Sequence, residues 1–92
     1  MSKVARKFLI TGEVQGVGYR FFAQRAAARH QVLGYVRNRA DGNVEAVAEG
    51  SPTDVEEFKK DLVTGPQWSR VDQVEEISVE PTGQYSSFRI ER

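Results

Sequence analysis

The residue pair Asp41-Gly42 constrains the fold more than any other feature of the sequence. Strand-like segments lie on both sides of it, at residues 32–39 and 43–49. Asp-Gly between two strands favours a tight primed turn, because the central residues of that turn need positive φ. The sequence therefore predicts an antiparallel hairpin in the middle of the chain, closed by a tight primed turn.

Helices are predicted before and after this hairpin. The segment 20–31 is rich in alanine, and helical spacing places four of its side chains on one face. These four are Phe22, Ala23, Ala26 and Ala27. After the hairpin, Ser51 can cap a second helix that ends at Gly65-Pro66. The apolar face of this second helix is predicted to hold Val55, Phe58 and Leu62.

Three more strands complete the pattern. Residues 7–11 form a first strand that ends at Gly12, residues 71–80 form a fourth, and Phe88 with Ile90 alternates in a short last one. The order strand, helix, strand, strand, helix, strand predicts an α+β fold of the ferredoxin-like split βαβ type. In that fold two helices cover one face of an antiparallel sheet. A chain of 92 residues supports one core, so we expect a single domain over residues 1–92.

Charge and composition limit the partners. The 13 basic and 13 acidic residues cancel, which argues against a nucleic-acid partner because polyanion binding needs uncompensated positive charge. Basic residues gather at Arg20, Arg25 and Arg29 and at Arg37 and Arg39, a distribution that fits a small, doubly charged anion. The chain has no cysteine, and its first apolar stretch is too short for a signal peptide or a membrane span. We therefore expect a cytoplasmic protein with no membrane partner, and we take it to be a monomer.

A glycine-bearing segment joins the first strand to the first helix. It reads Gly12-Glu13-Val14-Gln15-Gly16-Val17-Gly18-Tyr19-Arg20. Glycine leaves backbone amides uncovered, so the amides from Gly12 to Gly18 can converge on one anion, next to the positive end of the following helix. Arg20 adds a planar fork that matches two phosphate oxygens. The same residues also fit an ordinary strand-to-helix turn with a solvated Arg20. The spacing of the glycines matches neither a Walker loop nor a dinucleotide-binding fingerprint.

Asn38 is the other candidate for a functional role. It lies on a strand close to the turn, where a polar amide interrupts the apolar pattern. One interpretation is a strand-end residue that satisfies the backbone of the turn. The other is a residue that holds a water molecule in a fixed direction, because its amide both donates and accepts and does not titrate.

Together these two segments resemble the acylphosphatase family. The loop G-E-V-Q-G-V-G-Y-R is similar to the family pattern G-x-V-Q-G-V-x-[FY]-R. The segment G-Y-V-R-N-R-A-D-G-N-V-E is similar to its second block, G-[WY]-V-x-N-x-x-D-G-x-V-E. The similarity extends from the first strand to the last, and two motifs of this length in the right order are highly specific.

The resemblance implies a small hydrolase, without metal or cofactor, that cleaves acyl phosphates to a carboxylate and orthophosphate. Arg20 falls on the family's phosphate-binding arginine and Asn38 on its water-positioning asparagine, and the cradle falls on residues 12–18. Because a carboxylate leaves easily, direct attack by water is the preferred mechanism. Inorganic phosphate is then both a product and a competitive inhibitor.

Some residues depart from the family pattern, and other functions stay open. Glu13 stands where the family often has a basic residue, and we expect it to point to solvent. His30 is expected to be a helix-end or core residue, and Tyr35, Trp68 and Tyr85 are expected to pack.

The main alternative function is a phosphate-binding or regulatory domain without turnover. An RNA-binding module is disfavoured, because the third strand has no aromatic residue on which a base could stack.

Overall fold

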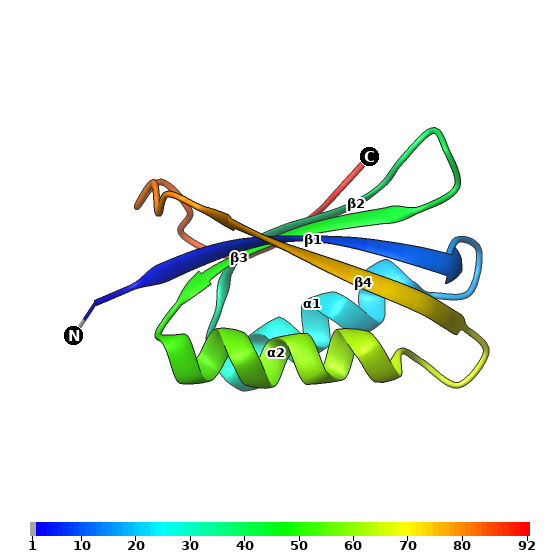
Figure 1. Ribbon diagram of the computed structural model, residues 1–92, viewed down its shortest axis with the longest axis horizontal. Coiled ribbons are helices and arrows are strands. Elements are labelled where there is room, and N and C mark those ends of the chain that lie inside the picture. The colour runs from blue at the N-terminus through cyan, green and yellow to red at the C-terminus, as the bar shows by residue number, and fades with distance from the viewer. Residues whose placement is uncertain (1) are drawn as a thin grey trace.

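The computed structural model describes residues 2–92 as a five-stranded sheet with two helices on one face (Figure 1). In chain order the elements are β1 (Val4–Glu13), α1 (Tyr19–His30), β2 (Leu33–Asn38), β3 (Val44–Gly50), α2 (Pro52–Thr64), β4 (Arg70–Val79) and β5 (Phe88–Glu91). The strand order is β4-β1-β3-β2-β5. This arrangement confirms the predicted split βαβ fold.

One strand pairing differs from the predicted antiparallel sheet. The β1–β3, β1–β4 and β2–β3 pairs are antiparallel, whereas β5 pairs with β2 in parallel. The reason is topological: β4 ends at the end of the sheet where β2 begins, so the segment 80–87 crosses that end and β5 runs back beside β2. Buried Glu49 holds this crossing segment, because its carboxylate accepts hydrogen bonds from the amides of Thr82 and Gly83 at 2.7 and 3.2 Å.

The second helix forms as predicted. The Ser51 hydroxyl caps α2 by accepting a hydrogen bond from the amide of Asp54 at 3.1 Å, and Gly65 follows its last residue. Its buried residues are Val55, Phe58 and Leu62. The Phe58 ring lies between those of Phe8 and Phe88, with centroid distances of 6.2 and 5.5 Å, and so joins the helix to the sheet.

The first helix begins one residue earlier than predicted. Its buried residues are Tyr19, Ala23, Ala26 and Ala27, whereas Phe22 is only half-buried. The Tyr19 hydroxyl donates a hydrogen bond to the carbonyl oxygen of Leu62 at 2.6 Å, and burial raises the pKa of this hydroxyl. Tyr19 therefore fixes the start of α1 against α2, directly before Arg20.

The hairpin between β2 and β3 is confirmed, but the prediction of a tight primed turn is wrong. The amide of Arg39 donates a hydrogen bond to the carbonyl oxygen of Asn43 at 2.8 Å. The amide of Gly42 donates one to the carbonyl oxygen of Arg39 at 3.2 Å. Gly42 has φ of 92°, but Asp41 does not have positive φ. Its carboxylate instead accepts a hydrogen bond from the amide of Asn43 at 3.0 Å. The loop thus contains three residues, a type I turn followed by a left-handed glycine.

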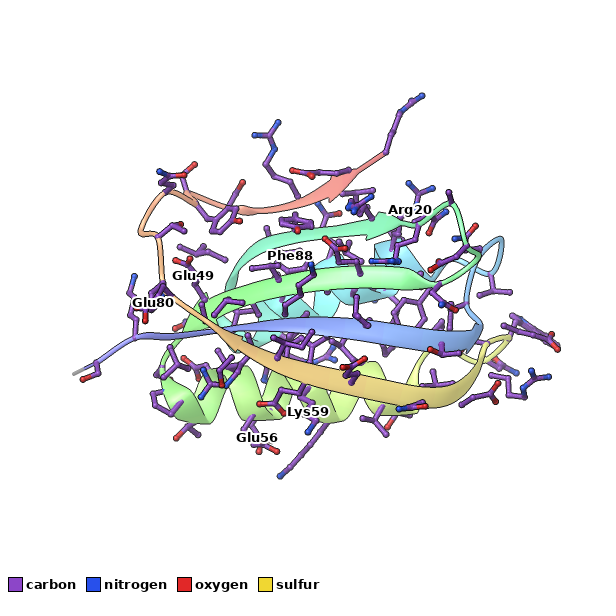
Figure 2. The ribbon with its side chains drawn as sticks, turned by 45° about the horizontal axis from the view of Figure 1, so that its top comes forward. Arg20, Glu49, Glu56, Lys59, Glu80 and Phe88 are labelled. Carbon is purple, nitrogen blue, oxygen red and sulfur yellow. The ribbon has the colours of Figure 1, made fainter. Side chains whose placement is uncertain are left out.

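Three connections gather at one end of the sheet: the β1–α1 loop, the β2–β3 hairpin and the α2–β4 loop (Figure 1). Arg20 lies toward this end, and Glu49 and Glu80 lie at the other (Figure 2). None of the helices within residues 2–92 is long and apolar enough to cross a membrane. The fold therefore brings the two sequence motifs to the same end of the molecule.

Candidate active site

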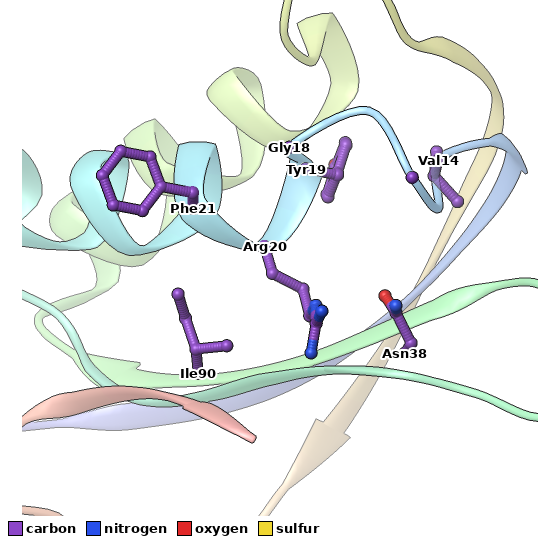
Figure 3. Close-up of a pocket in the computed structure, with 8 residues that line it drawn as sticks. Val14, Gly18, Tyr19, Arg20, Phe21, Asn38 and Ile90 are labelled. Atoms are coloured by element: carbon purple, nitrogen blue, oxygen red, sulfur yellow. The ribbon is translucent and has the colours of Figure 1, made fainter. Parts of the chain in front are cut away.

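A cavity of about 190 Å³ lies between the β1–α1 loop and the ends of β2 and β5 (Figure 3). Its lining residues are Val14, Gly16, Gly18, Tyr19, Arg20, Phe21, Asn38 and Ile90. Arg20 extends from the first turn of α1 toward Asn38, the last residue of β2 (Figure 3). The structure thus brings the two candidate residues into one cavity.

The backbone of the loop is uncovered where it lines this cavity. Gly16 and Gly18 have φ of 76° and 80°, and a Cβ atom on either would meet nothing within 4 Å. Glycine is therefore required here for its backbone conformation and not to avoid a clash. Gly18 is also the N-cap of α1, with no side-chain cap and no acidic residue in the first turn. The positive end of the helix stays available to an anion.

The last strand, β5, holds the Arg20 side chain by one hydrogen bond. Its Nη1 donates a hydrogen bond to the carbonyl oxygen of Glu91 in β5 at 3.2 Å. A guanidinium has five N–H donors, so this bond leaves most of them for a ligand. The last strand therefore orients the arginine without neutralising its charge.

Gln15 connects the loop to the hairpin, a role that the sequence does not predict. Its Nε2 donates hydrogen bonds to the carbonyl oxygens of Arg39 and Asn43, both at 2.8 Å. These two carbonyls close the hairpin that follows Asn38. Gln15 therefore fixes the distance between the glycine-bearing loop and the strand that carries Asn38.

The remaining residues of the predicted cradle do not line the cavity. Gly12 and Glu13 belong to β1 and pair with Val71 and Arg70 of β4. The Glu13 carboxylate is exposed and bound to the Arg70 guanidinium, which confirms that it points to solvent. Val17 packs against the hydrophobic core. The stretch of the loop that lines the cavity is therefore shorter than the predicted cradle of residues 12–18, since it starts at Val14.

A buried carboxylate organises the strands next to Asn38. Glu45 is only 2% exposed and accepts hydrogen bonds from Tyr35, Arg37 and Arg39, with Lys7 at 3.8 Å. Burial raises the pKa of the Glu45 carboxyl, but the bonds from Tyr35 and Arg37 and the charge of Lys7 outweigh burial and hold this pKa below its usual value. Burial, and then the bond to Glu45, raise the pKa of Tyr35 to about 12.

This network changes the interpretation of the basic residues. The clustering of Arg37 and Arg39 in the sequence predicts a nearby anionic ligand, but in the structure both guanidinium groups bind Glu45. They flank Asn38 in the chain and therefore hold the end of β2 in place. Arg20 is the basic side chain that lines the cavity.

The other singled-out residues lie outside the cavity. His30 is the last residue of α1, and its Nε2 lies 2.8 Å from the Asp61 carboxylate of α2, as expected for a helix-end residue. Trp68 is 78% exposed, so the prediction that it packs is wrong. The rings of Tyr35 and Tyr85 contact each other, with centroids 6.2 Å apart. These side chains take no part in lining the site.

Fold and site together define a class: a small α+β domain in which two loop glycines, the start of a helix and one arginine line a single cavity. Such a combination is suited to a phosphate-sized anion. In the part of the chain that the structure describes, no group of three or more His, Cys, Asp or Glu side chains is placed to hold a metal ion.

Comparison with known proteins defines the family. The acylphosphatase family model matches residues 6–90. An acylphosphatase of Moorella thermoacetica is 47% identical over 90 residues, 98% of this chain and 96% of that protein. The crystal structure of an acylphosphatase from Bacillus subtilis has a TM-score of 0.93 at 30% identity, covering 97% and 99% of the two chains. This chain belongs to the acylphosphatase family.

The same fold also occurs within a much larger protein. The crystal structure of HypF from T. kodakarensis has a TM-score of 0.85 at 36% identity. The match covers 97% of this chain but only 12% of that one. A domain of this kind is therefore used both alone and as a small part of a longer polypeptide.

Proposed function

We propose that this protein is an acylphosphatase that hydrolyses the carboxyl-phosphate bond of acyl phosphates to a carboxylate and orthophosphate. The observation that carries the proposal is the shared cavity: Arg20, Asn38 and the uncovered backbone at Gly16 and Gly18 all line it. The substrate is a small-molecule acyl phosphate, and inorganic phosphate is a product that competes for the same cavity.

The loop and Arg20 hold the phosphoryl group. Amides of the loop that starts at Val14, together with the start of α1, donate to the phosphoryl oxygens, and the dipole of α1 adds positive potential. Arg20 supplies two parallel N–H donors from its planar fork, and the hydrogen bond from its Nη1 to the carbonyl oxygen of Glu91 orients that fork. Charge that develops on the phosphoryl oxygens during the reaction meets donors that are already in place.

Asn38 positions the attacking water. Its amide accepts one hydrogen bond from the water and donates another, so the water oxygen faces the phosphorus atom. The water oxygen forms a bond to phosphorus while the bond from phosphorus to the acyl oxygen breaks. The carboxylate leaves with the electron pair, and a phosphate oxygen takes the proton of the water. A good leaving group makes a separate general acid unnecessary.

The reaction as proposed requires no metal ion and no cofactor. The positive field comes from the Arg20 guanidinium, from backbone amides and from the helix N-terminus, all of which are part of the chain. We extend the proposal to a cytoplasmic monomer without membrane partners. The absence of cysteine is consistent with a reducing compartment, and the balanced charge argues against a nucleic-acid partner.

A non-catalytic domain that binds phosphate or an acyl phosphate is the second candidate, favoured by the similarity to a small part of HypF. Hydrolysis of benzoyl phosphate distinguishes the two. We expect saturable turnover that is unchanged by chelator and competitively inhibited by inorganic phosphate. Phosphate binding without turnover would instead support the non-catalytic domain, and strict dependence on magnesium would contradict the mechanism.

A further inference from the structure

One wall of the cavity is apolar and open to water. It consists of Phe21 and Ile90, which are 59% and 37% exposed. Both side chains lie on the side of Arg20 that faces away from Asn38 (Figure 3). Large apolar side chains in contact with water beside a charged site are candidates for binding the apolar part of a ligand.

A groove of about 530 Å³ adjoins this wall at Phe21, which lines both the groove and the cavity. It runs along α1 and is bounded on the other side by Val32, Leu33 and Phe88. Ala28 of α1 is exposed on its rim, and the Arg25 guanidinium lies over the Phe21 ring at 6.0 Å from the centroid. The surface of the groove is mostly apolar, and Phe21 is the lining residue that the groove shares with the cavity.

The direction of the reaction relates this groove to the substrate. In an in-line displacement the leaving group departs on the side of the phosphorus atom opposite the attacking water. With the water at Asn38, the acyl group must lie on the far side of the phosphoryl group, which is the side of Phe21 and Ile90 (Figure 3). The groove therefore lies on the side of the cavity toward which the acyl group points.

We infer that Phe21 and Ile90 bind the acyl group, and that the groove along α1 takes the chain of a long apolar acyl group. The favoured substrates are therefore acyl phosphates with an aryl or medium-length alkyl chain. This inference rests on the proposed function, because it uses the water position at Asn38. Arg25 contributes through its contact with Phe21 and closes the rim of the groove.

The expected preference for longer acyl chains follows from the apolar surface area of the chain that is buried when the substrate binds. Each fully buried methylene favours binding by about fourfold. The groove is open along one side, so a chain in it is only partly buried, and we expect kcat/KM for octanoyl phosphate to exceed that for acetyl phosphate by about tenfold or more. Such binding far from the reacting bond acts on substrate and transition state alike.

The test compares acetyl, benzoyl and octanoyl phosphate on the wild-type protein and on two tryptophan variants. Ala28→Trp places a large side chain in the groove, whereas Val63→Trp adds the same side chain at an exposed position of α2, outside the groove. We expect Ala28→Trp to lower the octanoyl-to-acetyl ratio of kcat/KM by about tenfold and Val63→Trp to leave this ratio unchanged. Phe21→Ala, as a second variant, should lower the benzoyl-to-acetyl ratio.

The possible outcomes separate this inference from the proposed function. If acetyl phosphate is hydrolysed but the octanoyl-to-acetyl ratio is near one, or is unaffected by Ala28→Trp, the acyl groove is refuted and the proposed function stands. If no acyl phosphate is hydrolysed, the proposed function fails and the inference fails with it.

Discussion

Replacing Gln15 by leucine tests whether the hairpin holds the phosphate loop in its working position. The change removes two hydrogen bonds, each 2.8 Å long, to the carbonyl oxygens of Arg39 and Asn43. One such bond contributes about 0.5–1.5 kcal/mol. Both carbonyls keep a backbone hydrogen bond, and Gln15 is only half-buried, so water can replace part of the loss. The free energy of unfolding should therefore fall by only about 1–2 kcal/mol.

The effect of Gln15→Leu on activity should be larger than this loss of stability implies. The loop with Gly16 and Gly18 loses its connection to the strand of Asn38, and a displacement of about 1 Å can lower a rate a hundredfold. We expect kcat for benzoyl phosphate to fall by about tenfold to a hundredfold at a temperature where the variant is fully folded.

Urea unfolding and steady-state kinetics on the same preparation measure both quantities for Gln15→Leu. Gln73→Leu is the matched control, because Gln73 is exposed on β4 and lies outside the cavity. A variant with reduced stability but normal kcat would refute the positioning role of Gln15, and so would an equal loss of kcat in the control.

Two further predictions concern charged groups. Arg20→Lys should lower kcat/KM by about a hundredfold and weaken inhibition by phosphate, because lysine keeps the charge but loses the planar fork; near-normal kinetics would contradict the bidentate role. The Glu45 carboxyl has a folded-state pKa below the usual value of about 4.5 for a glutamate, so its stabilising effect is present above pH about 4.5 and is lost as the pH falls through the folded pKa. Glu45→Gln should lower the free energy of unfolding at pH 7 by about 1–2 kcal/mol and flatten the decline toward acid pH; identical urea-unfolding profiles against pH would refute this.

Local signals in the sequence predicted the helices and strands well. Ser51 and Gly65 mark the ends of α2, because capping involves residues close together in the chain. The hairpin was also predicted, but its turn type was not. Asp41 uses its side chain to bind the amide of Asn43, and that contact selects a three-residue loop over a tight primed turn.

Contacts between distant residues could not be predicted in the same way. The sequence shows basic residues at Arg37 and Arg39, but only the pairing of β2 with β3 places Glu45 against them. Likewise, nothing in the sequence distinguishes Gln15 from a solvated loop residue until the hairpin carbonyls are found beside it. The crossing of β5 to the far edge of the sheet, which brings Glu91 to Arg20, is also a property of the whole fold.

Kinetic analysis of Asn38→Ala tests the central claim most directly, because the proposed role of Asn38 concerns the water and not the phosphate. The hairpin is closed by backbone bonds between Arg39, Gly42 and Asn43, so the fold should not depend on this amide. We predict that kcat for benzoyl phosphate falls by about a hundredfold or more, while the inhibition constant of phosphate and the urea-unfolding midpoint stay unchanged. A kcat that falls only in proportion to lost stability, or a parallel loss of phosphate affinity, would contradict the mechanism.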